Sequence, residues 1–166
     1  INKELSIANQ GDIESSAFYR CKNIETLFVS NLGHIGNSAF AGCTNLKTLI
    51  ISNQGHVYSN AFSNCSNLKT ATISNNGNID SQAFYNCVGL EQVDISNQGY
   101  IGTQAFYECT SLTEITIPEG VTKIESSTFS GCYTLRNISL PSNLTSISSY
   151  AFNRCSFSSI EIPKNV

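Results

Sequence analysis

The chain has 166 residues, of which 40% are hydrophobic and 13% are charged, and its formal net charge is −3. A chain of this size can bury a real core, yet it carries about half the usual share of charge. Nine Lys and Arg residues provide no basic patch for a nucleic-acid backbone, and no apolar run approaches the length of a membrane-spanning helix. The surface rich in Ser, Asn and Thr favours an exported or cell-surface protein over a cytosolic enzyme.

A Phe-x-x-Cys motif recurs along the whole chain. The spacing between successive Phe residues is 22, 22, 22, 22, 23 and 23, with the motif starting at Phe18, Phe40, Phe62, Phe84, Phe106, Phe129 and Phe152. A fixed period this short predicts a solenoid, because one such unit cannot bury its apolar side chains alone. We expect a single array over residues 1–166, of about seven rungs. Residues 160–166 resemble the start of the unit at 115–121, so the array is expected to be a fragment truncated mid-repeat at both ends.

Each rung begins with a predicted strand. Apolar residues alternate with polar ones at eight places, which predicts one short parallel strand per rung with alternate side chains buried. The alternating pairs are Leu5/Ile7, Leu27/Val29, Leu49/Ile51, Ala71/Ile73, Val93/Ile95, Ile115/Ile117, Ile138/Leu140 and Ile160/Ile162.

The turn after the strand carries Asn and Gly in the first five rungs. We expect the Asn side chains to form a ladder that donates to and accepts from turn backbone groups of adjacent rungs. The glycines are expected to adopt positive φ and so allow the 22-residue length. From Pro118 onwards a proline replaces this turn. The two columns are Asn9, Asn31, Asn53, Asn75 and Asn97, and Gly11, Gly33, Gly55, Gly77 and Gly99.

The rest of the rung contains a buried aliphatic residue and then the Phe-x-x-Cys segment. A Ser, Thr or Asn stands three residues before each Phe, which predicts an N-cap and a short helical or 3-10 turn on the convex face. The seven cysteines lie at inward positions. Parallel Cβ vectors about 4.8 Å apart do not suit disulfides, so we expect buried, reduced thiols.

This pattern resembles the BspA-type, or Treponema pallidum-type, leucine-rich repeat. The signature Ala-Phe-x-x-Cys-x-x-Leu-x-x-Ile-x-Ile-Pro-x-x-Val-x-x-Ile is matched almost fully over residues 115–152, while the first five rungs have Ile-Ser-Asn-x-Gly in place of Ile-Pro-x-x-Val. The resemblance implies an α/β solenoid, a leucine-rich-repeat horseshoe with its strands on the concave face. It also implies a binding role in surface proteins of host-associated bacteria and protists, often as adhesins.

The outward strand residues form the candidate ligand-binding surface, because they do not build the core. Phe28 and Ile50 are neighbouring apolar residues in one outward column, and the following rungs become polar and then acidic. An apolar anchor beside a polar rim is typical of a protein-binding patch. Scattered exposed apolar residues are also ordinary on soluble proteins. The candidate residues are Phe28, Ile50, Thr72, Asp94, Glu114 and Thr116.

No catalytic constellation, phosphate loop or cofactor motif is present, so we expect no enzyme, no cofactor and no metal. His34 and His56 lie one rung apart in one column. Two imidazoles without a third ligand make a weak metal site, and solvated turn histidines are the simpler interpretation.

The sequence therefore predicts a cell-surface or secreted protein-binding or adhesion module whose partner is a protein, with host and matrix proteins as candidates. An architectural spacer without its own ligand and an intracellular protein-interaction scaffold are the alternatives. Self-association through the open ends of the array is a further candidate interaction, since these ends present unpaired strand edges.

Overall fold

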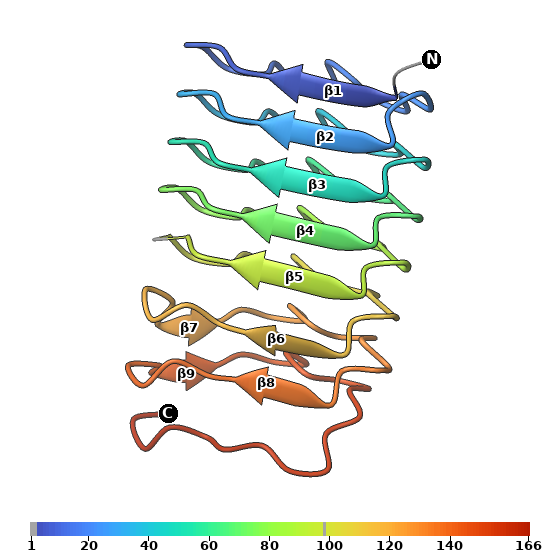
Figure 1. Cartoon of the computed structure of the whole chain (residues 1–166). Coiled ribbons are helices and arrows are strands. Elements are labelled where there is room, and N and C mark those ends of the chain that lie inside the picture. The colour runs from blue at the N-terminus through green and yellow to red at the C-terminus, as the bar shows by residue number, and fades with distance from the viewer. Residues whose placement is uncertain (1–2, 98) are drawn as a thin grey trace.

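The computed structural model describes residues 3–97 and 99–166 and shows a parallel β-solenoid whose rungs stack from the N-terminus to the C-terminus (Figure 1). No helix in these residues is long and apolar enough to cross a bilayer. The strands of the described part are β1 (Glu4–Ile7), β2 (Thr26–Val29), β3 (Thr48–Ile51), β4 (Thr70–Ile73), β5 (Gln92–Ile95), β6 (Glu114–Thr116), β7 (Lys123–Ile124), β8 (Asn137–Ser139) and β9 (Ser146–Ile147).

The strands pair in the register that the repeat predicts. β1 to β5 form one parallel sheet in sequence order, and each residue pairs with the one 22 positions later, as Leu27 does with Leu49. β6 pairs with β8 in a second sheet, and β7 pairs with β9 in a third. β7 and β9 correct the expectation of one strand per rung. They continue the aliphatic column before each Phe, where isolated bridges already join Ile13, Ile35, Val57, Ile79 and Ile101.

The ladder of the strand sheet is interrupted between β5 and β6, and we call this boundary the seam. In the earlier rungs the residue after each strand, such as Ser74 or Ser96, donates its N–H to a carbonyl of the preceding strand at 2.8 or 2.9 Å. Pro118 occupies the equivalent position and has no N–H to donate. The seam therefore coincides with the loss of this N–H, and the 23-residue spacing begins one step later, between β6 and β8.

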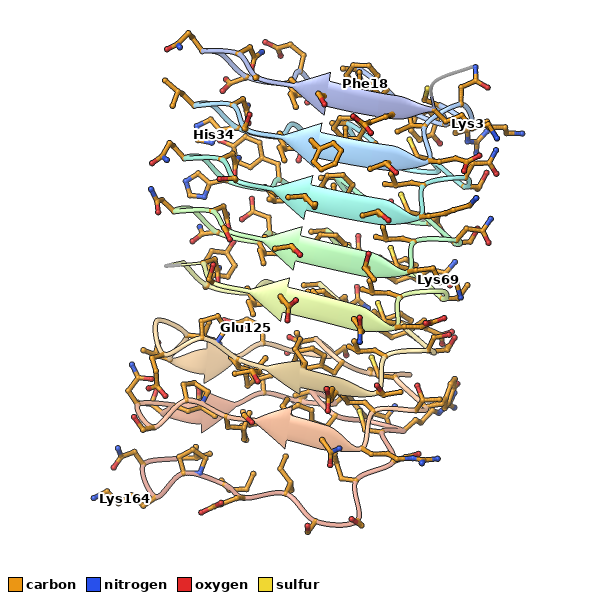
Figure 2. The ribbon with its side chains drawn as sticks, in the orientation of Figure 1. Lys3, Phe18, His34, Lys69, Glu125 and Lys164 are labelled. Atoms are coloured by element: carbon orange, nitrogen blue, oxygen red, sulfur yellow. The ribbon has the colours of Figure 1, made fainter. Side chains whose placement is uncertain are left out.

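The core is a column of stacked Phe rings between the strands and the turns. Neighbouring rings lie 4.9–5.8 Å apart between centroids, with interplanar angles of 1–11°. Phe62, Phe84 and Phe106 are fully buried and stand one above another, as the solenoid interpretation requires. Figure 2 shows Phe18 behind the strands at the first rung of this column.

The expected convex-face helices are absent from the described residues, where overlapping β-turns take their place. In the first rung, three turns are each closed by an N–H that donates to the carbonyl three residues earlier, from Ala17, Tyr19 and Cys21. The intervening N–H groups donate at 2.7–2.9 Å to carbonyls of the next rung, from Ser16, Phe18 and Arg20. A helix would direct every N–H along its own axis, so it could not make these bonds. Ser16 and Arg20 adopt φ of 59° and 56°, which breaks the helix.

The glycine column is close-packed rather than left-handed, so the expectation of positive φ was wrong. Positive φ among glycines is found at Gly42 and Gly131, in the turn after Phe. At Gly77, an added Cβ would lie 2.7 Å from the carbonyl oxygen of Gly55 in the preceding rung. Glycine is needed here because successive turn backbones approach too closely for any side chain.

The Asn ladder forms, but only as a donor. Asn31, Asn53, Asn75 and Asn97 are 1–2% exposed, and the first three donate Nδ2–H to the carbonyl of the glycine in the preceding rung at 3.1–3.3 Å. Asn97 donates to its own rung, to the carbonyl of Gly99 at 3.0 Å. Their Oδ1 atoms have no partner among the described residues, which corrects the expected accepting role.

The last predicted strand, at Ile160 and Ile162, is not formed. Cys155 precedes Ile160 by five residues, whereas Cys132 precedes Ile138 by six. Phe157 packs edge-on against Phe152 at 5.6 Å and contributes to the core near the usual place of a Leu. This one-residue shortening displaces the chain from the register that would pair it with β8.

The cysteines are free, and five of the seven are buried. From the second rung on, each Sγ–H donates to the carbonyl of the Phe in the preceding rung, as Cys87 does to Phe62 at 3.1 Å. Burial raises the pKa of Cys43 to about 12 and that of Cys155 to about 11. The thiols of Cys43 and Cys155 therefore stay protonated at neutral pH and act as donors.

We expect Gly77→Ala to destabilise the solenoid by about 1–3 kcal/mol, because the new methyl group meets backbone rather than a movable side chain. Gly11→Ala is the matched control, since an added Cβ there has nothing within 4 Å. Urea unfolding followed by circular dichroism measures both. Equal midpoints for the two variants would contradict the close-packing role.

We expect the free energy of unfolding to fall as the pH rises above about 9. An unfolded thiol releases its proton near 9.0, while folded Cys43 keeps it to about 12, so alkaline conditions favour the unfolded chain. Each such thiol contributes a slope of at most about 1.4 kcal/mol per pH unit. Urea midpoints under reducing conditions at about pH 8 and about pH 9.8 measure the fall, and Cys43→Ala should reduce it. A pH-independent midpoint would contradict the burial of neutral thiols.

Candidate functional site

The outward side chains of β1–β6 and β8 form one surface, which we call the strand face. The register places Ser6, Phe28, Ile50, Thr72 and Asp94 side by side in one column across β1 to β5. Phe28 is half-buried and Ile50 is 36% exposed. The two apolar candidates are therefore direct neighbours, with Thr72 between them and the acidic residue.

The other candidate residues meet at the seam. Thr72, Asp94, Glu114 and Thr116 line a groove of about 440 Å³ that spans β4 to β8. Asn137 and Ser139 of β8 complete it, paired in register with Glu114 and Thr116. The sequence analysis identified the first four residues but missed the groove. Pro118 was the signal, because a proline after the strand has no N–H to donate to the preceding rung.

A chain of ion pairs borders the strand face at the amino ends of the strands, where Figure 2 shows Lys3 and Lys69. Glu25 accepts from Lys3 and also from Lys47 at 2.7 Å, and Lys69 donates to Glu91 at 2.5 Å. Hydrogen bonds from Lys3 and Lys47 lower the pKa of Glu25 to about 2. The charges of this edge are therefore largely neutralised among themselves.

The two histidines lie at the opposite edge, beyond the carboxyl ends of the strands, where Figure 2 labels His34. Their rings stack 5.1 Å apart. The His34 Nδ1 accepts the N–H of His56 at 2.9 Å, and the His56 Nδ1 accepts that of Asn78 at 2.9 Å. Asp12 and Asn78 play the same part at other levels of the stack. The Asp12 Oδ1 accepts the backbone N–H of His34 in the next rung, and the Asn78 Oδ1 accepts that of Tyr100.

We call this set the acceptor column, and it gives the histidines a structural role that sequence reasoning missed. Each side chain satisfies a turn N–H of the next rung, and the Nδ1 atoms are thereby engaged. No group of three or more His, Cys, Asp or Glu residues in the described part of the chain could hold a metal ion.

The repeat sequence matches the model of the BspA type leucine rich repeat region, in six copies over residues 3–99 and 99–166. The chain belongs to this family. A search of curated protein sequences finds no match.

Solved structures of leucine-rich repeat proteins share the fold. The chain is 23% identical to the Treponema pallidum leucine-rich repeat protein, with a TM-score of 0.67, over 88% of this chain and 74% of that one. It is 28% identical to a leucine-rich cell surface protein of Faecalibacterium prausnitzii, with a TM-score of 0.63, over 99% of this chain and 42% of that one. A Bacteroides ovatus leucine-rich repeat protein is 23% identical, with a TM-score of 0.52, over 92% of this chain and 58% of that one. The chain thus spans about half the length of the latter two.

The strand face offers apolar contact and hydrogen bonding. It combines two apolar side chains, a row of hydroxyls and two carboxylates on a rigid sheet. Solenoid families with such surfaces are generally protein-interaction modules.

We expect His56→Ala to leave the N–H of Asn78 without an acceptor and to destabilise the fold by about 1–2 kcal/mol. His56→Asn is the matched variant, because Asn78 already performs the same accepting role one rung later. Amide hydrogen exchange of Asn78, measured by NMR, should accelerate in the Ala variant and stay slow in the Asn variant. Equal protection in both would show that the imidazole is not the acceptor.

Proposed function

We propose that the chain is a protein-binding module that engages its partner through the strand face, and not an enzyme. The observation that carries the proposal is the register pairing of Phe28 with Ile50, which sets two accessible apolar side chains next to each other. The other outward strand positions of this chain are mostly hydroxyls, so this pair is the natural centre of a contact.

The groove at the seam gives the contact its polar part. Asp94 and Glu114 lie on the same face as the apolar pair and suit a partner segment that carries Lys or Arg beside an apolar side chain. The hydroxyls of Thr72 and Thr116 supply donors and acceptors between them. The proposed site is therefore Phe28, Ile50, Thr72, Asp94, Glu114 and Thr116.

We also place the module outside the cell, as part of a surface-displayed or secreted adhesin. The low charge, the abundant Ser, Thr and Asn, and the likeness to a protein described as a leucine-rich cell surface protein support this location. An architectural spacer is the second candidate, because the outward strand residues of most rungs are small hydroxyl-bearing side chains without an apolar anchor. Labelling of intact cells with an antibody against the array distinguishes an exposed protein from an intracellular scaffold.

The double change Phe28→Ser and Ile50→Ser should weaken partner binding at least tenfold, since it removes the apolar centre of the contact. The stability should fall by about 1–3 kcal/mol, because Phe28 is half-buried, and circular dichroism should show that the double variant remains folded. Leu32→Ser is the matched control, since Leu32 is 51% exposed but lies outside the strands.

The experiment immobilises the array, captures labelled surface proteins from host cells, and then titrates the captured partner by biolayer interferometry. Loss of binding in the double variant and retention in Leu32→Ser would support the strand face. Capture that is unchanged in both variants would rule it out and leave the spacer interpretation.

A further inference from the structure

The face opposite the strands, formed by the Phe-x-x-Cys turns, is called the turn face, and it carries a recess that the protein-binding proposal does not use. The residue after each Phe lies on this face and is large in several rungs, as at Tyr85 and Tyr107, whose rings stack 5.0 Å apart. In the first three rungs the same column is Tyr19, Ala41 and Ser63. Two small residues after a tyrosine leave a hollow of about 580 Å³, within the range of roughly 300–1,000 Å³ of small-molecule sites.

The floor of this turn-face recess contains a hydroxyl without a partner. Ser63 is 4% exposed and lines the recess, yet no hydrogen bond to its side chain is found among the described residues. Ser130 occupies the same column and is 5% exposed, but its hydroxyl accepts from Asn153 at 3.4 Å. The buried polar atoms that lack a partner do not include the Ser63 Oγ, so this hydroxyl reaches solvent and is available to a ligand that enters the recess.

The rim of the recess is positive. Arg20 and Lys22 line it, and no carboxylate does. Neither residue forms an ion pair in the described part of the chain, whereas Lys47 and Lys69 are bridged to glutamates. The guanidinium of Arg20 is held over the ring of Tyr19, 5.1 Å from its centroid, which limits its freedom before any ligand arrives. A net charge of −3 makes this local excess of positive charge distinctive.

The remaining lining is neutral and hydrogen-bonding, from Ser38, Thr44 and Asn64. The backbone offers little to a peptide, because the N–H groups of Arg20, Gly42 and Asn64 already donate to the next rung at 2.8 Å. The recess must therefore recognise a ligand through its side chains. It needs an anionic group at one end and several hydroxyls along the roughly 10 Å that two rungs provide.

We propose that the turn-face recess binds an acidic saccharide, in which a carboxylate or sulfate pairs with Arg20 and Lys22 and ring hydroxyls bond to Ser63 and its neutral neighbours. Arg is the preferred partner of planar oxyanions because its fork donates two parallel hydrogen bonds. The site is separate from the strand face, so one rung array presents a protein contact on one side and a sugar contact on the other.

The test is a titration of the whole ¹⁵N-labelled chain with a heparin-derived disaccharide. Binding is monitored through the amide chemical shifts in NMR spectra. Shifts should concentrate around Ala41, Gly42 and Ser63. The double change Arg20→Gln and Lys22→Gln should weaken binding at least tenfold, and Ser63→Ala about fivefold. Shifts spread over other lysines, or unchanged affinity in the double variant, would overturn the proposal.

A filling variant gives a second, independent readout. Ser63→Tyr places in the recess the residue that the same column already holds at Tyr85, so the fold should tolerate it and binding should be lost. Ser130→Tyr is the control in the same column and should bind normally. Maltotriose tests the need for charge, while sodium sulfate and a phosphoserine peptide test the need for the sugar. Equal or tighter binding of any of these three would overturn the assignment to an acidic saccharide.

Discussion

Hydrogen bonding between the backbones of successive rungs is the constraint on which the rest of the structure depends. It fixes the rungs about 4.8 Å apart and keeps equivalent residues in line. It operates in the strands, where Leu27 pairs with Leu49, and equally in the turns, where Phe18 donates to Ala39 at 2.7 Å. A rung of this length has too few apolar side chains to fold alone, so this alignment is what makes a core possible.

The alignment converts each position of the repeat into a column with one physical task. Flat Phe rings stack because their separation of about 5 Å suits offset aromatic contact. Cysteine suits its column because it is small, apolar and able to donate a weak bond to the Phe carbonyl of the rung before. Asp, His and Asn replace one another in the acceptor column, since the task there is only to present a lone pair to an N–H of the next rung. The residues that recur in every rung therefore serve to hold successive rungs together.

The sequence predicted the features that depend on side-chain burial and period. The solenoid, the strand register and the inward Phe, Cys and Leu columns follow from spacing alone, because burial repeats with the rung. The expectation of helical turns was wrong because an N-cap residue indicates only a preference for a helix. The hydrogen bonds between rungs override this preference, and residues such as Ser16 and Arg20 adopt positive φ. The glycine column was misinterpreted because spacing does not distinguish a left-handed residue from one that is close-packed. The groove and the recess form where particular rungs depart from the repeat pattern. They become visible only when neighbouring rungs are placed side by side in the structure.

Binding sites in such an array are expected where the residues of a rung differ from the repeat pattern. A regular column presents the same side chain at every rung and distinguishes no ligand from another along its length. The seam arises where Pro118 removes a backbone donor, and it gathers Asp94 and Glu114 over one groove. The recess arises where Ala41 and Ser63 replace a large residue in the turn column. Both departures leave the Phe stack continuous through them, with Phe40 to Phe62 and Phe84 to Phe106 each 5.3 Å apart, so the surface varies without cost to the core. A solenoid can thus acquire binding sites by local substitution, because the contacts that hold its rungs together lie in other columns.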